Sequence, residues 1–96
     1  MSFHFIVRFE TIPGKETAFR QTLLHVVPFS RAEPGCVNIH VYESLHEPTQ
    51  FAIHSEWADE TAFERHVEMP YTVRFVEEAE KLLTHRIQGL RSREIA

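Results

Sequence analysis

The stretch FAIHSEWADETAFERHVEMP, residues 51–70, holds a predicted strand, a helix cap and a histidine that comes shortly before a proline. Up to Trp57, its side chains alternate between a mainly apolar face and a more polar face, which is typical of a half-buried strand. Asp59 then suits the cap of a helix over residues 59–67, and His66 falls near the end of that helix. A large ring and a titratable imidazole thus stand at the two ends of one strand–helix unit, where they can line a small pocket. A packed core with a surface histidine would produce the same pattern.

The N-terminal half of the chain predicts a strand, a helix and a second strand. Apolar and polar side chains alternate over residues 3–10, with Ile6 as the exception. After the turn at Pro13-Gly14, apolar side chains recur at helical spacing: Phe19, Leu23, Val26 and Val27. Pro28 is expected to end or kink this helix. Residues 36–45 alternate again and place three apolar side chains on one face: Val37, Ile39 and Val41.

The C-terminal part predicts a further helix and a last strand. Pro70 suits the first position of a helix whose buried stripe is Phe75, Val76, Ala79, Leu82 and Leu83. Residues 86–95, interrupted by Gly89, form a weakly apolar strand. The expected order is β-α-β-β-α-α-β. This order indicates one α+β domain over residues 1–96, with a ferredoxin-like antiparallel sheet.

The composition excludes several classes of protein. The chain has 96 residues, of which 43% are hydrophobic and 25% charged, as expected for one globular domain with a modest core. A net charge of −4 argues against nucleic acid as the main partner. No apolar run approaches the roughly 20 residues of a membrane span, and no signal-peptide pattern is seen. Cys36 is the single cysteine, so we expect a reducing, cytoplasmic setting.

One face of the predicted sheet is left uncovered by the helices. Alternation places ionisable side chains there, mixed with Ile6 and Ala52: His4, Arg8, His54 and Glu56. Such a surface is too mixed for a monomer's core and too apolar to be purely solvated. Two copies that pack sheet to sheet would bury it, with Arg8 as a candidate partner of Glu56. The sequence therefore predicts a homodimer through the sheet face.

Four short segments follow one another along the chain: PGKETAF (13–19), SRAEPGC (30–36), the EW pair within 51–66, and HVEMP (66–70). In their order and spacing they resemble the antibiotic biosynthesis monooxygenase family of dimeric α+β barrels, which includes quinol monooxygenase-like proteins. The resemblance implies a ferredoxin-like protomer that dimerises through its sheet and holds an apolar pocket between sheet and helices. It also implies oxidation of a phenolic or quinol-type small aromatic by molecular oxygen, with no cofactor.

Two residues match positions of this family that bear on the chemistry. Trp57 matches the Trp at the end of a strand, where it is either a core ring or a pocket wall that stacks an aromatic substrate. His66 matches the His before the Met-Pro junction. An imidazole titrates near about 6.5, so His66 can accept a proton from a phenol as a catalytic base. The alternative role is an interaction with unpaired carbonyls at a helix end.

Further substrate-binding residues are expected on the neighbouring elements. Tyr71 and Phe75 lie one turn apart on the third helix, where they either line the same pocket or pack in the core. Ile53 and Ser55 hold the inward positions before Trp57, where some cofactor-independent members of the family have an Asn. We expect both to line the pocket.

Cofactor chemistry is not indicated by the remaining residues. The haem-degrading branch needs an Asn on the first strand, where Val7 and Arg8 stand, and a His on the later helix, where residues 71–83 have none. Three imidazoles on adjacent strands would suffice for a zinc ion: His4, His40 and His54. No histidine pair at metal-ligand spacing accompanies them, so no metal site is predicted. Cys36 is expected to be a small buried residue rather than a reactive thiol.

Three functions are compatible with these observations. The first is a cofactor-independent monooxygenase in which His66 deprotonates an aromatic substrate. The second is an isomerase or aldolase-like enzyme, in which His66 moves a proton on a small oxygenated metabolite without oxygen consumption. The third is a non-catalytic ligand-binding or stress-response module that uses the same pocket.

Overall fold

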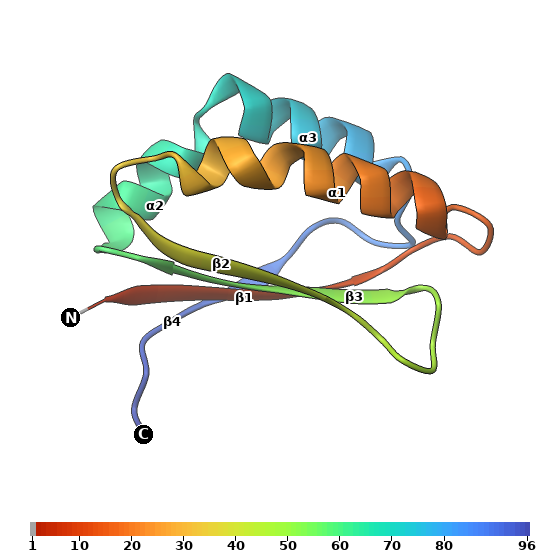
Figure 1. Cartoon of the computed structure of the whole chain (residues 1–96), viewed down its shortest axis with the longest axis horizontal. Helices are drawn as coiled ribbons and strands as arrows, with labels where there is room; N and C mark the ends of the chain where they lie inside the picture. Colours follow the sequence, from red (N-terminus) through yellow and green to blue (C-terminus); the bar gives the residue numbers. More distant parts are fainter. Residues whose placement is uncertain (1) are drawn as a thin grey trace.

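The computed structural model describes residues 2–96 of the chain. Its elements follow in the order β1 (Phe3–Glu10), α1 (Glu16–Arg31), β2 (Cys36–Glu43), β3 (Gln50–Trp57), α2 (Glu60–Val67), α3 (Pro70–Glu80) and β4 (Gly89–Ser92) (Figure 1). This order confirms the predicted α+β, ferredoxin-like fold. Within residues 2–96, no helix has the length and apolar character needed to cross a membrane.

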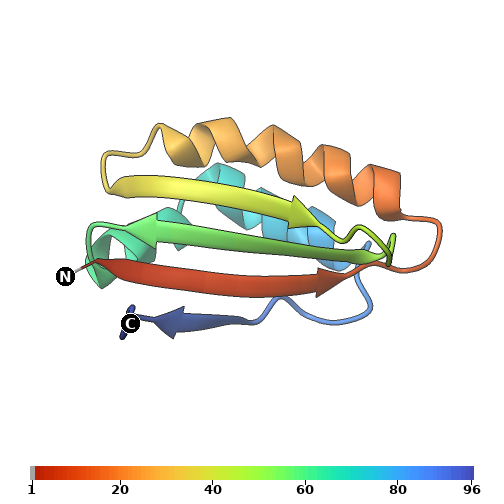
Figure 2. The same cartoon turned by 60° about the horizontal axis from the view of Figure 1, so that its bottom comes forward.

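The strands form one antiparallel sheet in the spatial order β2-β3-β1-β4. The central strands β1 and β3 pair along their whole lengths, from Phe3 opposite Trp57 to Glu10 opposite Gln50. All three helices lie on one face of the sheet, and no helix or strand of residues 2–96 covers the other face (Figures 1 and 2). The residues after β4 leave the sheet on this uncovered side (Figure 1).

Two clusters of buried side chains fill the space between sheet and helices. One packs α1 and α3 against the sheet and includes Phe9, Phe19 and Leu23. The other packs α2 against the sheet and includes Trp57 and Phe63. Three partly buried side chains contact both clusters: Phe5, Val41 and Ile53. The core is therefore divided, and its middle is less tightly buried than its two ends.

The sequence predicts that Pro28 ends or kinks the first helix; it does not end it, because α1 continues to Arg31. Pro28 lacks an N–H, so the helix loses one hydrogen bond there. The helix is held together across this position by packing, because Val27 before Pro28 and Ser30 after it are both buried on the inner side. Burial of an amphipathic face outweighs the local preference for breaking the helix.

Strand β2 begins with an irregularity that the alternation did not predict. A β-bulge lies between Cys36 and Asn38, so that Cys36 pairs with Trp57 and Asn38 pairs with Glu56. Val37 falls within the bulge and is 55% exposed, although it was expected to share the inner face with Ile39. An extra residue in one strand shifts the alternation of the side chains, and this explains the difference.

Strand β4 is shorter than the predicted range 86–95 and spans only Gly89–Ser92. It begins where Gly89 lies against the ring of Phe5, so closely that a Cβ on Gly89 would overlap that ring. The strand pairs with β1 up to Ser92, which is opposite His4. Ile95 is 91% exposed, because the chain has already left the sheet.

The uncovered face carries the ionisable side chains that the alternation predicts. Nδ1 of His4 lies 2.8 Å from Nε2 of His54, and the two rings stack with their centroids 5.1 Å apart. Glu56 accepts a hydrogen bond from the amide of Asn38 at 3.2 Å. Within the chain, Arg8 lies opposite Ala52 and His4 lies opposite Glu56, so the predicted pairing of Arg8 with Glu56 is one between two copies.

Candidate active site

An apolar cavity of about 250 Å³ lies between the sheet and the helices, where the two core clusters meet. Its walls are mostly aliphatic and aromatic side chains, among them Phe5, Val7, Ile53, Trp57, Phe63 and Phe75. This volume is smaller than the roughly 300–1,000 Å³ of sites for drug-sized ligands. The cavity therefore has room only for a small molecule.

Helix α2 brings His66 to the wall of this cavity. Asp59 caps the helix, and its Oδ1 accepts a hydrogen bond from the backbone N–H of Ala62 at 2.8 Å. Gly35 allows the helix to pack closely on the turn after α1, because a Cβ at this position would overlap the Cβ of Ala62. The end of α2 is thereby held beside that turn, where Glu33 stands.

His66 is enclosed by an aromatic ring and a carboxylate. Its ring centroid lies 4.5 Å from that of Trp57, and its side chain is 15% exposed. Its Nδ1 lies 2.8 Å from Oε2 of Glu33. An ionised carboxylate only accepts hydrogen bonds, so Nδ1 carries the proton. When the imidazole is neutral, Nε2 is then its hydrogen-bond acceptor, and the imidazole ring lines the cavity.

Glu33 is a buried carboxylate with two donors. It is 9% exposed, and the hydroxyl of Tyr71 donates to the same Oε2 that His66 contacts. Burial raises the pKa of Tyr71 above its ordinary value, and the hydrogen bond and charge of Glu33 raise it further. Tyr71 therefore stays protonated and donates. Burial and the charge of Glu33 also raise the pKa of the Cys36 thiol, which disfavours a reactive thiolate.

The cavity has few other polar groups. Ser55 accepts a hydrogen bond from the indole N–H of Trp57 at 3.0 Å. Arg91 lies over the ring of Phe63 and is paired with Glu60 and Glu64 on the surface of α2. Thr72 is 7% exposed, and its Oγ1 has no hydrogen-bond partner among residues 2–96. This hydroxyl is a hydrogen-bonding group at the cavity wall that the described chain does not use.

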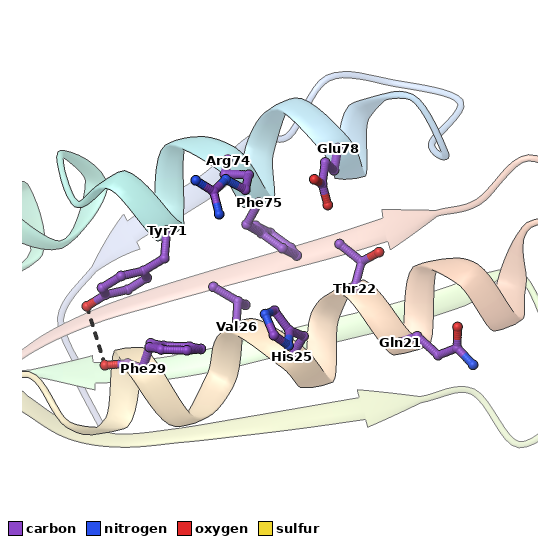
Figure 3. A pocket seen from close by; sticks show the side chains of 9 residues that line it. All are labelled: Gln21, Thr22, His25, Val26, Phe29, Tyr71, Arg74, Phe75 and Glu78. Carbon is purple, nitrogen blue, oxygen red and sulfur yellow. Dashed lines mark hydrogen bonds between the residues drawn. The ribbon is translucent and has the colours of Figure 1, made fainter.

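Most of the residues proposed from the sequence lie at this cavity, and one lies elsewhere. The cavity lining includes Ile53, Ser55, Trp57, His66 and Phe75. Tyr71 instead faces an outer groove of about 390 Å³ between α1 and α3 (Figure 3). Its ring packs on that of Phe29, with centroids 5.5 Å apart, and its hydroxyl lies 3.3 Å from the Phe29 carbonyl oxygen. Phe75 lines both hollows.

Glu33 and Thr72 are two site residues that the sequence did not predict. Glu33 lies in the SRAEPGC segment, where an acidic residue just before a Pro-Gly turn was the only available signal. Nothing in that local pattern indicates burial or a partner on α2, 33 residues further along the chain. Thr72 follows Pro70 by two residues, and the periodicity of α3 alone does not mark it as a cavity residue.

Comparisons with known proteins agree on the fold. The chain resembles three solved structures, across 97–100% of its own length and 94–97% of theirs. The first comes from Mycobacterium tuberculosis (22% identity, TM-score 0.92) and the second from Pseudomonas aeruginosa (29% identity, TM-score 0.85). The third is a variant of SnoaB, a cofactor-independent oxygenase of Streptomyces nogalater (19%, 0.82).

Sequence comparison identifies the family. An uncharacterised protein of Synechocystis is 32% identical over 71 residues, which are 74% of this chain. The chain spans about half the length of that curated relative, 48%. Residues 2–78 match the family described as antibiotic biosynthesis monooxygenase. With this match over most of its length, the chain belongs to the antibiotic biosynthesis monooxygenase family.

Proposed function

We propose that the chain is a cofactor-independent oxygenase that oxidises a small phenolic or quinol-type aromatic with molecular oxygen. The observation that carries this proposal is the 2.8 Å contact between Nδ1 of His66 and Oε2 of Glu33 at the wall of an apolar cavity. When the imidazole is neutral and donates through Nδ1–H, Nε2 is left as a base. The ring of Trp57 beside it supplies a flat surface for an aromatic substrate.

The reaction begins with proton transfer. The hydroxyl proton of the phenol passes to Nε2 of His66, and the phenolate that forms is rich enough in electrons to give one electron to O₂. Superoxide and the phenoxyl radical combine through a new carbon–oxygen bond, and His66 returns the proton to give a hydroperoxide. Loss of water, with the hydrogen of that ring carbon, leaves a quinone. One phenol and one O₂ thus yield one quinone and one water.

An apolar cavity favours this chemistry. Water would stabilise the phenolate and slow its electron transfer, and it would also react with the intermediates. The walls around His66 are aromatic and aliphatic, and the Trp57 indole N–H is already bonded to Ser55. The chain therefore needs to supply only one base and a dry, fitted hollow.

Oxygen uptake with a panel of phenols and quinols tests the proposal, with products identified by mass spectrometry. His66→Ala should lower uptake by about 10²–10⁴-fold, the usual contribution of a general base. His46→Ala, at an exposed histidine between β2 and β3, serves as the matched control. Equal uptake by wild type and His66→Ala contradicts the assigned role. Turnover without oxygen consumption indicates an isomerase, and saturable binding without any product indicates a ligand-binding module.

We also propose that two copies associate through the uncovered face of the sheet. Apolar side chains stand well exposed there: Ile6 at 44%, Tyr42 at 54% and Leu90 at 61%. They share this face with the His4–His54 pair and Glu56. A second copy would cover these side chains, and the residues after β4, which leave the sheet on the same side (Figure 1), could then reach the partner.

A further inference from the structure

The buried carboxylate of Glu33 is an unusual group to find behind the wall of an apolar cavity. Its side chain is 8% exposed, and it lies close to the rings of His66 and Tyr71. Removing a carboxylate from water is costly unless hydrogen-bond donors replace the water. A well-packed apolar side chain serves stability about equally well. The presence of the charge therefore points to a task at His66.

We propose that Glu33 is a positioning residue, which fixes both the tautomer and the orientation of His66; this rests on the proposed function of His66 as the base. A neutral imidazole carries one proton, and the contact of 2.8 Å with an acceptor places it on Nδ1. The lone pair then belongs to Nε2. With the opposite tautomer, Nε2 would carry a proton and could not accept one from a substrate.

Tyr71 completes the unit from the side of the outer groove. The hydroxyl of Tyr71 and Nδ1 of His66 converge on one oxygen, Oε2 of Glu33. The Tyr71 side chain therefore holds the carboxylate in place from the outer groove, while the imidazole of His66 lies on the cavity side. The three residues come from the turn after α1, the end of α2 and the start of α3. The unit therefore forms only when these segments are packed together. Tyr71 thus acts through Glu33 rather than as a cavity wall.

The tautomer can be measured directly by ¹⁵N NMR of the imidazole, at a pH where His66 is neutral. We expect the wild type to show the Nδ1–H form. Glu33→Leu removes the acceptor at similar size, and we expect the Nε2–H form to become substantially populated. Glu33→Gln keeps an acceptor oxygen and should keep the Nδ1–H form. Glu47→Leu, at an exposed residue between β2 and β3, is the matched control and should match the wild type.

Steady-state kinetics provide the second readout. Glu33→Leu should lower kcat by at least about tenfold, part of the roughly 10²–10⁴-fold that a general base contributes, with little change in KM. Glu33→Gln should recover most of this loss. Tyr71→Phe removes one of the two hydrogen-bond donors to the Glu33 carboxylate but leaves the carboxylate itself. Its fall in kcat should therefore be smaller than that of Glu33→Leu.

The outcomes separate this inference from the proposed function. A wild-type Nε2–H tautomer overturns the inference, and so does a Glu33→Leu variant with unchanged tautomer and unchanged kcat. If Glu33→Leu does not fold, the tautomers of the wild type and of Glu33→Gln still test the inference, because both are expected to show the Nδ1–H form. If the wild type consumes no oxygen while the tautomers behave as expected, the oxygenase proposal fails and the positioning role of Glu33 stands.

Discussion

The ring of Trp57 lies against the ring of His66, with centroids 4.5 Å apart and planes inclined at 32°. The indole is fully buried and its N–H is bonded to Ser55. The candidate base is thus held on one side by a rigid aromatic surface and on the other by Glu33. Because Trp57 is the single tryptophan of the chain, its fluorescence reports on this cavity alone.

We expect the fluorescence of Trp57 to change in a saturable way when a small phenol binds without oxygen present. Ile53→Phe fills part of the cavity lined by Ile53 and should weaken this binding by at least about tenfold, because the space for the ligand is lost. Leu45→Phe, at a residue that is 93% exposed, serves as the control and should bind as the wild type does. Equal affinity of both variants would mean that the ligand binds elsewhere.

Tyr71 makes the free energy of unfolding fall as the pH rises into the alkaline range. Its pKa is raised in the folded chain, so folding favours its protonated form. This stabilisation is complete below the ordinary tyrosine pKa of about 10 and declines as the pH rises above that value, because the unfolded chain then loses the proton first. Urea unfolding between about pH 8 and pH 11 should show a steeper loss of stability for the wild type than for Tyr71→Phe. Tyr42→Phe, at the 54% exposed tyrosine of β2, should leave the slope unchanged.

The close packing of Gly35 on Ala62 predicts a compensating pair of substitutions. Gly35→Ala should destabilise the fold by about 1–3 kcal/mol, because the new methyl group overlaps Ala62 and displaces α2. Adding Ala62→Gly removes the overlap, although glycine itself costs about 1 kcal/mol in a helix. A double-mutant cycle by urea unfolding should therefore show a favourable coupling of at least about 0.5 kcal/mol. Strictly additive effects would contradict the contact.

The uncovered sheet face predicts a variant that separates the proposed dimer. Ile6 lies opposite His54 near the middle of this face, so Ile6→Glu places a carboxylate in the expected interface. We expect at least about a 30-fold weaker association, which corresponds to roughly 2 kcal/mol. Light scattering at micromolar concentration should give twice the chain mass for the wild type and for the exposed control Leu45→Glu, and a lower mass for Ile6→Glu. A monomeric wild type would refute the dimer.

Local sequence patterns predict the helix starts of this fold well where one residue has a strong preference for that position. Asp59 caps α2 and Pro70 opens α3 as expected. Packing decides the rest. The helix continues through Pro28 because Val27 and Ser30 on either side of it are buried on its inner face. Val37 is exposed because a bulge shifts the register of β2. Neither effect is visible in a single segment read by itself.

The site was predictable to the extent that its residues stand within one strand–helix unit. Trp57 and His66 lie nine residues apart in the chain, and the end of a strand followed by a short helix brings them together. Glu33 was not predictable, because its contacts depend on how the turn after α1 meets α2 and α3. The same packing turns Tyr71 outward, whereas helical spacing alone suggested that it shares the inner pocket with Phe75.

The hollow at the centre of the divided core has a mechanical consequence. To the extent that water does not fill this hollow of about 250 Å³, it is lost as a void when the chain unfolds, and unfolding is accompanied by a decrease in volume. Hydrostatic pressure therefore favours the unfolded chain more strongly than it would in a solidly filled domain of equal length. A molecule that occupies the hollow removes this compressible space, and so the protein becomes more resistant to pressure once it is loaded.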